Sequence, residues 1–194
     1  NLVLVSDEIY EAITFGGARH ESPATLGPEA RARTVVVNSL SKTYAMTGWR
    51  VGYCAGPAET IDRMFLVLQQ SSRGPATFVQ DAAVAALSGP QTPVEQMRRE
   101  YERRRQQVID ALAPVSRARV IPPAGGFFAM VDVRALEARS DAIRRRLLHE
   151  NGVAVVHGAA YGPSGEGMLR VSFAGGGEPL ARGLALLREG LDAA

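Results

Sequence analysis

The stretch NSLSKTYAMTGWRVGYCAGP, residues 38–57, joins two strand-like runs and contains Lys42, the only lysine of the chain. The other 21 of the 22 basic residues are arginines. A guanidinium keeps its charge in proteins, whereas a lysine amine can lose its proton and condense with a carbonyl group. A lysine that stands alone among arginines therefore indicates a chemical task for residues 38–57.

Composition sets the class of protein. With 194 residues and 46% hydrophobic residues, the chain is long enough for one packed domain or for parts of two. The net charge is only +2, and the arginines of residues 98–105 alternate with glutamates. This pattern is typical of a solvated helix face and does not indicate a nucleic-acid partner.

Cysteine usage and hydropathy bear on the compartment. Cys54 is the only cysteine, so no internal disulfide can form, and we expect a cytoplasmic protein in which Cys54 is a small buried hydrophobe. No apolar run approaches the ~20 residues of a membrane span, and no signal peptide is visible. We therefore expect no membrane association.

The order of the elements predicts an α/β fold in two parts. Short β-branched runs at residues 2–5, 34–37 and 51–55 predict strands buried on both faces beneath helices. Helical periodicity follows at 58–70, where Ile61, Met64, Phe65 and Leu68 form one apolar stripe, and then at 77–87 and 92–112.

The later part predicts a smaller α+β region. We expect a turn and strand within 120–133, helices at 141–150 and 179–191, and strands at 153–156 and 168–173. The corresponding domain boundaries are 1–90, a connecting long helix at 91–116, and 117–194.

Two polar clusters directly follow apolar runs: SDEIY at 6–10 and NSLSK at 38–42. Ligands of open α/β sheets bind beyond the carboxyl ends of the strands, so parallel neighbouring strands would bring Asp7 and Lys42 to one crevice. Arg50 precedes the third run, so that strand should be antiparallel to the other two. The expected pocket then contains Asp7, Tyr10, Ser39, Ser41, Lys42 and Arg50.

The chemistry of these groups predicts a ligand. The lysine amine suits an aldehyde, and the Arg50 fork with the two serine hydroxyls suits a phosphate. The Asp7 carboxylate suits a basic ring nitrogen, and the Tyr10 phenol suits a ring oxygen. Pyridoxal 5′-phosphate carries all four of these handles, and no residue set suggests a metal.

The sequence resembles the class I/II aminotransferases, which are fold-type-I pyridoxal-phosphate-dependent enzymes, and among them the aspartate and aromatic aminotransferases. The resemblance rests on four motifs: SDEIYE, NSLSKTYAMTGWRVGYCAGP, PPAGGFFAMVDV and GMLRVSFA. They spread over most of the chain. The resemblance implies a fold that consists of part of the mixed sheet of the large domain together with the small α+β domain.

The resemblance assigns a role to each pocket residue. Lys42 would form the Schiff base with the cofactor and then move the proton at the substrate α-carbon. Asp7 would pair with the ring nitrogen and Tyr10 with the ring oxygen. Ser39, Ser41 and Arg50 would hold the phosphate. Arg170, in the LRVSFA motif, would bind the α-carboxylate of the amino-acid or 2-oxo-acid substrate.

Structural alternatives remain open for the same residues. Asp7 could cap a helix that starts at Glu8, and Tyr10 could be a core residue. Arg50 and Arg170 could form structural ion pairs. His157 stands where the family usually has proline, and its role and that of Arg73, which could meet a dicarboxylate across a dimer, are not readable.

The resemblance also implies a longer protein. The motifs match the C-terminal half of family members, so we expect the 194 residues alone to hold only part of the cofactor cage and to be inactive. The intact protein would be a homodimer. Two other functions remain possible on this scaffold: another pyridoxal-phosphate enzyme, such as a carbon–sulfur lyase or a decarboxylase, or the sensor domain of a transcriptional regulator.

Overall fold

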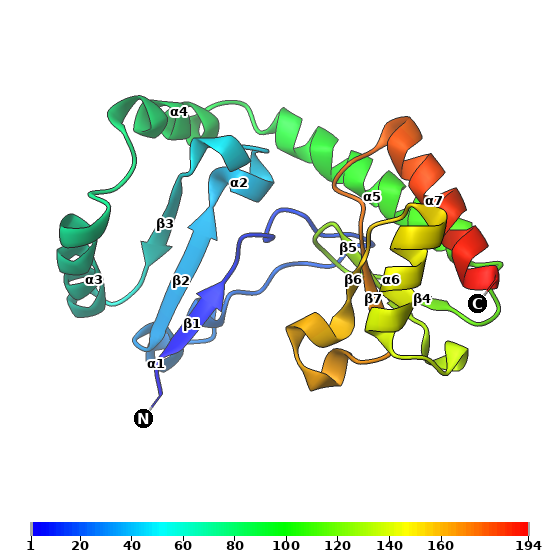
Figure 1. Ribbon diagram of the computed structural model, residues 1–194. Coiled ribbons are helices and arrows are strands. Elements are labelled where there is room, and N and C mark those ends of the chain that lie inside the picture. Colours follow the sequence, from blue (N-terminus) through cyan, green and yellow to red (C-terminus); the bar gives the residue numbers. More distant parts are fainter. Residues whose placement is uncertain (1, 194) are drawn as a thin grey trace. The chain divides into compact units, whose positions relative to one another are not determined.

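A computed structural model of the protein describes residues 2–193. The chain divides into two compact units, one up to Gln96 and one from Met97 onward. Each unit is described by itself below, and Figure 1 gives the element labels. Within the described residues, no helix has the length and apolar character needed to cross a bilayer.

The first unit contains a three-stranded sheet with the order β1-β2-β3. Its strands are β1 (Leu4–Asp7), β2 (Thr34–Ser39) and β3 (Gly52–Ala55). β1 runs parallel to β2, with Asp7 opposite Val37, and β3 runs antiparallel to β2, with Gly52 opposite Ser39. The predicted parallel pair and the reversed third strand are thus confirmed, although β1 begins two residues later than expected.

Helices surround this sheet (Figure 1). They are α1 (Pro28–Arg31), α2 (Leu40–Thr43), α3 (Ala58–Ser71) and α4 (Thr77–Ser88), with 3-10 turns η1 (Pro23–Thr25) and η2 (Thr47–Trp49). α3 directly follows Pro57. α4 is followed by Gly89, whose backbone N–H donates a hydrogen bond to the Ala85 carbonyl. Proline marks the start of a helix and glycine marks its end, and these two signals located α3 and α4 in the sequence.

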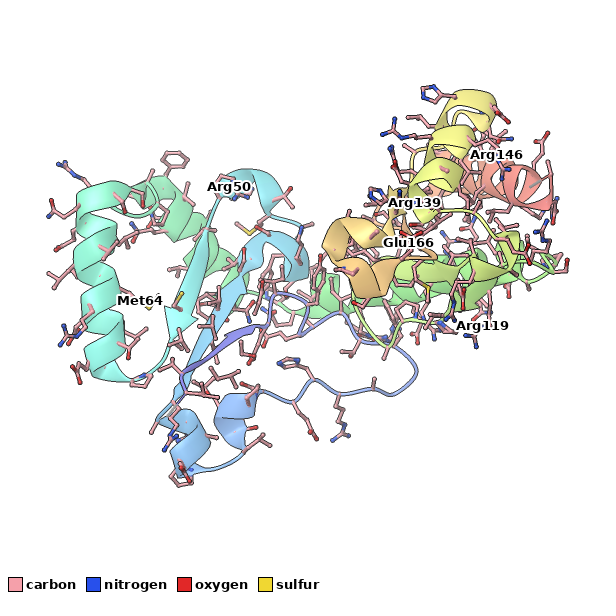
Figure 2. All side chains as sticks on the ribbon, turned by 60° about the horizontal axis from the view of Figure 1, so that its bottom comes forward. Arg50, Met64, Arg119, Arg139, Arg146 and Glu166 are labelled. Atoms are coloured by element: carbon pink, nitrogen blue, oxygen red, sulfur yellow. The ribbon has the colours of Figure 1, made fainter. Side chains whose placement is uncertain are left out.

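Burial in the first unit differs from the prediction. No residue of β1 or β3 is buried, and Cys54 is exposed, so the expectation of strands buried on both faces holds only for part of β2. The predicted stripe of α3 lines a cavity of about 820 Å³ beside β3 and packs against no core. Figure 2 labels Met64 on this helix. One cluster of buried residues in this unit consists of Leu40, Val51, Val79 and Ala83.

The second unit contains a four-stranded antiparallel sheet with the order β4-β5-β7-β6. Its strands are β4 (Arg119–Ile121), β5 (Phe128–Asp132), β6 (Val156–His157) and β7 (Met168–Ser172). The run at 120–133 therefore gives two strands, and the strand expected at 153–156 begins only at Val156. The short turns are η3 (Arg134–Leu136), η4 (Gly158–Tyr161) and η5 (Pro163–Gly165).

Three helices complete this unit: α5 (Thr92–Leu112), which begins in the first unit, α6 (Ser140–Asn151) and α7 (Gly177–Asp192). α6 and α7 lie side by side (Figure 1). Their apolar faces and one face of the sheet form a tight core in which Leu147, Leu169 and Leu187 are almost fully buried. Strict alternation along β5 and β7 leaves the other face of the sheet half-exposed.

Candidate active site

Lys42 lies in α2, directly after the carboxyl end of β2. Ser39 caps this helix: its backbone is extended, and its Oγ accepts a hydrogen bond from the Ser41 N–H at 3.1 Å. Leu40 anchors the turn because it is only 1% exposed. Lys42 itself is half-buried, so neighbouring residues cover part of its side chain. The residue lies at the edge of the sheet where β2 ends.

Asp7 and Tyr10 belong to the neighbouring strand end. Because β1 is parallel to β2 and Asp7 pairs with Val37, Asp7 lies at the same edge as residues 38–42. Its Oδ1 accepts a hydrogen bond from the Ile9 N–H at 3.3 Å. No helix begins here: residues 9–12 are turns, and the Tyr10 carbonyl accepts from the Ile13 N–H. The helix-capping alternative for Asp7 is therefore wrong.

Arg50 reaches this edge because β3 starts there. It follows η2 in the left-handed region, with φ 53° and ψ 45°, which for a non-glycine residue costs roughly 1–2 kcal/mol. The side chain is exposed, and one guanidinium nitrogen donates to the Thr47 carbonyl at 3.0 Å. Figure 2 shows Arg50 at the turn before β3. The guanidinium forms no ion pair with a carboxylate of residues 2–193.

Close backbone approach keeps this edge compact. A Cβ on Gly52 would lie 2.7 Å from the Asn38 carbonyl oxygen, so only glycine lets β3 begin beside Asn38 and Ser39. The Ser39 and Ser41 hydroxyls are 2.9 Å apart, and Ser39 Oγ also lies 3.0 Å from the Val51 carbonyl. The ends of β1 and β2 and the start of β3 thus lie at one edge of the sheet, and the predicted pocket of six side chains at this edge stays a prediction.

A buried carboxylate, which the sequence analysis missed, supports the Asp7 turn. Glu8 is 4% exposed and accepts hydrogen bonds from Ser22 Oγ at 2.6 Å and His20 Nε2 at 2.9 Å. Burial raises the pKa of Glu8, but hydrogen bonds from Ser22, His20 and Ser6 outweigh it, so the pKa lies below its ordinary value.

Glu8 also belongs to the group with metal-ligand spacing that the described residues contain, together with Glu11 and His20, whose ligand atoms lie within 4.8 Å of one another. The hydrogen bonds from His20 and Ser22 already satisfy the Glu8 carboxylate. Glu8, His20 and Ser22 therefore form a structural clamp on the turn.

Tyr53 is the other perturbed group near this edge. Its residue pairs with Asn38 across β2 and β3. Burial and the nearby Glu11, Tyr44 and Glu8 raise the pKa of the Tyr53 phenol above its ordinary value.

Arg170 lies in the second unit, at the middle of β7. Its guanidinium carbon is 4.2 Å from the centre of the Phe128 ring and 4.6 Å from that of Tyr161. It forms no ion pair with a carboxylate of residues 2–193, and its role toward the substrate α-carboxylate stays a prediction.

Two further residues left open by the sequence can be placed. His157 ends β6, and its Nδ1 is 3.6 Å from Asp141 Oδ1 at the start of α6. Arg73 follows α3 with φ 58°, and its N–H bonds the Leu68 carbonyl. No role is assigned to either residue.

The family profile described as "Aminotransferase class I and II" matches residues 1–185. The chain belongs to this family. The family match and the geometry of the site agree, because the matched residues include the turn that carries Lys42 and the two strand ends that flank it. Class I and II aminotransferases use pyridoxal phosphate, the ligand predicted from the pocket residues.

Individual relatives support the assignment. The chain is 41% identical over 178 residues to an aspartate aminotransferase of Geobacillus stearothermophilus, covering 89% of this chain and 45% of the relative. It is 43% identical over 180 residues to an arginine–pyruvate transaminase of Pseudomonas aeruginosa, covering 93% and 45%.

A solved structure gives the same picture. The aromatic aminotransferase of Pyrococcus horikoshii superposes with a TM-score of 0.94 at 38% identity, covering 99% of this chain and 51% of that one. The expected fold class, a partial mixed sheet with a small α+β part, is confirmed. The chain spans about half the length of the curated relatives it matches.

Proposed function

We propose that the protein to which this chain belongs is a pyridoxal-phosphate-dependent aminotransferase that transfers the amino group of an L-amino acid to a 2-oxo acid. The observation that carries the proposal is the position of Lys42, the single lysine, one turn beyond β2 and beside the end of the parallel strand that carries Asp7. The family match over residues 1–185 supports it.

The donor set at this edge fits the cofactor. Lys42 would attach it covalently, Asp7 would face the ring nitrogen and Tyr10 the ring oxygen. Ser39, Ser41 and Arg50 would hold the phosphate. Two hydroxyls 2.9 Å apart, together with the exposed Arg50 guanidinium, which forms no ion pair with a carboxylate of residues 2–193, would form a suitable anion site. When bound, the cofactor supplies an electron sink for the substrate α-carbon.

The residues of the chain would do the rest of the work. Asp7 would stabilise a proton on the ring nitrogen, because a nearby negative charge favours the protonated form of a base. The Lys42 amine would remove the proton from the substrate α-carbon and return it to the cofactor carbon. Arg170 would hold the α-carboxylate and so orient the bond that breaks. Arginine at position 42 could not carry out the proton transfer assigned to Lys42, because its guanidinium stays protonated.

We further propose that residues 1–90 form part of a large cofactor domain, that 91–116 form a connecting helix, and that 117–194 form a small domain. The intact protein would act as a homodimer in the cytoplasm. The relatives carry the names of aspartate, arginine–pyruvate and aromatic aminotransferases, so the donor amino acid has to be found with a panel of these three classes.

An amino-transfer assay tests the proposal. The intact protein, supplied with cofactor, is expected to convert at least one of aspartate, arginine or phenylalanine with 2-oxoglutarate as acceptor. Lys42→Arg should lower kcat by more than about 1,000-fold, since general acid–base catalysis alone contributes roughly 10²–10⁴. Equal turnover by Lys42→Arg, or no amino transfer with any donor by the unaltered protein, would contradict the proposal.

A further inference from the structure

The sheet of the second unit presents Arg170 on its half-exposed face. β5 and β7 are antiparallel, with Met130 opposite Arg170 and Phe128 opposite Ser172. The intervening residues, such as Val131 and Leu169, are 0% exposed and belong to the core on the other face. Phe128 is therefore the diagonal neighbour of Arg170 on the same face, a position from which aromatic and long side chains reach one another.

The guanidinium of Arg170 lies over two aromatic rings. Phe128 contributes one from β5 at 4.2 Å, and Tyr161 contributes the other from the end of η4 at 4.6 Å. Both distances are well inside the ~6 Å within which a cation is attracted by the face of a ring. The two residues are 33 positions apart in the sequence, so the arrangement depends on the fold and not on a local motif.

Both rings are held from behind. The Phe128 ring centre is 5.0 Å from that of Phe127, a residue only 7% exposed, and Phe127 in turn packs 5.5 Å from Tyr101 of α5. Tyr161 is 58% exposed, yet its backbone is fixed, because Gly158 and Gly165 pack so closely that neither leaves room for a Cβ. Ring packing thus supports Phe128, and the close contact between η4 and η5 supports the backbone that carries Tyr161.

The rings hold the guanidinium without neutralising it. The acid on the same sheet face, Asp132, is already paired with Arg134 and lies 3.6 Å from Arg119. Hydrogen bonds from Arg134, together with the charges of Arg134 and Arg119, outweigh burial and hold the pKa of Asp132 well below its ordinary value. No carboxylate pairs with Arg170 within residues 2–193, so its fork of N–H donors stays available for a planar, bidentate anion.

We infer that Phe128 and Tyr161 are positioning residues that hold the Arg170 guanidinium for the carboxylate of the substrate. The inference rests on the proposed function and adds to it the means by which the carboxylate site is kept ready. A ring can orient a planar guanidinium by stacking, which it cannot do for the tetrahedral ammonium of a lysine. The stacked rings also leave the edge of the guanidinium as the side that a ligand carboxylate would approach, next to the exposed Tyr161.

The test uses Tyr161, because an exposed residue can be changed without a large cost in folding. Tyr161→Leu removes the ring, and Tyr161→Phe keeps the ring and removes only the hydroxyl. Binding of succinate, a dicarboxylate without an amino group, to the cofactor-loaded intact protein is measured by calorimetry. We expect Tyr161→Leu to weaken binding by about 3- to 30-fold and Tyr161→Phe to stay within about 2-fold.

Steady-state kinetics provide the second readout. Loss of a contact that holds the carboxylate site in position should raise KM for the amino donor by a larger factor than it lowers kcat. A general structural defect would instead lower kcat and the melting temperature together. Phe128→Leu, with Phe128→Tyr as its ring-keeping counterpart, should repeat the pattern from the other side of the guanidinium.

The outcomes separate this inference from the proposed function. Succinate binding that is insensitive to both ring deletions, or that is absent from the unaltered protein, would overturn the inference even if amino transfer is observed. Ring-dependent succinate binding without amino transfer would support it and contradict the proposed function, because the titration requires no turnover.

Discussion

In the first unit Leu2, Val3 and Val5 are 83, 70 and 65% exposed, whereas in the second unit Val131, Leu169 and Phe173 are each 0% exposed. The second unit covers its own apolar faces with α6 and α7. In the first unit, local hydrogen bonds hold the site: the Ser39 cap, the Asp7 contact with Ile9, and the Glu8 clamp. Positioning of the lysine edge therefore depends on backbone and polar contacts, and that of Arg170 depends on packing.

The largest effect should come from the core of the second unit. Leu147→Ala removes a side chain that is 0% exposed and should lower the free energy of unfolding by about 2–5 kcal/mol. Leu148→Ala, one position along α6 and 41% exposed, should change it by less than about 0.5 kcal/mol. Urea unfolding followed by circular dichroism measures both. Similar losses for the two variants would show that the described packing is wrong.

A smaller effect should come from the polar clamp of the first unit. Glu8→Gln keeps the size of the side chain but removes the charge that accepts from Ser22 and His20, and should cost about 1–3 kcal/mol. Glu11→Gln is the matched control, because Glu11 is exposed. Trp49, the single tryptophan, lies in the first unit and reports its unfolding by fluorescence. Equal effects of the two variants would remove the clamp from the account.

The smallest effect should appear at acidic pH in the second unit. Hydrogen bonds from Arg103 and Arg104 lower the pKa of Glu100 from 4.5 to about 2. Since the folded value lies below the unfolded one, this stabilisation is present above about pH 4.5 and is lost as the pH falls toward 2. Solvent screens these partly exposed groups, so the contribution should stay below about 1 kcal/mol.

The urea midpoint measured against pH checks this expectation. The decline between about pH 4.5 and 2 should be shallower in Glu100→Gln than in the unaltered protein. Glu150→Gln, an exposed change on α6, serves as the control and should leave the slope as it was. A slope that Glu100→Gln leaves unaltered would contradict the ion-pair account.

The sequence was sufficient for the elements and their order at the lysine edge. Apolar runs, Pro57 and Gly89 located the strands and the long helices, and the place of Arg50 predicted the reversal of β3. These features depend on local patterns and on strand direction. The short α2 helix around Lys42 was missed, since four residues carry no helical period.

Burial and tertiary pairing could not be predicted in the same way. Cys54 and the stripe from Ile61 to Leu68 have a core-like composition, but whether a neighbour covers them is decided elsewhere in the molecule. The Glu8 clamp joins residues 12 and 14 positions apart, and the Tyr161 contact joins β7 to a loop. Neither pairing leaves a local signal, so both require the three-dimensional structure.

Borohydride reduction of the cofactor-loaded intact protein, followed by peptide mapping, tests the central claim most directly. Because the 194 residues contain one lysine, the modified peptide should be the one that carries Lys42. A pyridoxyl adduct on that peptide, absent from Lys42→Arg, is the predicted result. An active enzyme whose adduct lies on any other residue would contradict the account.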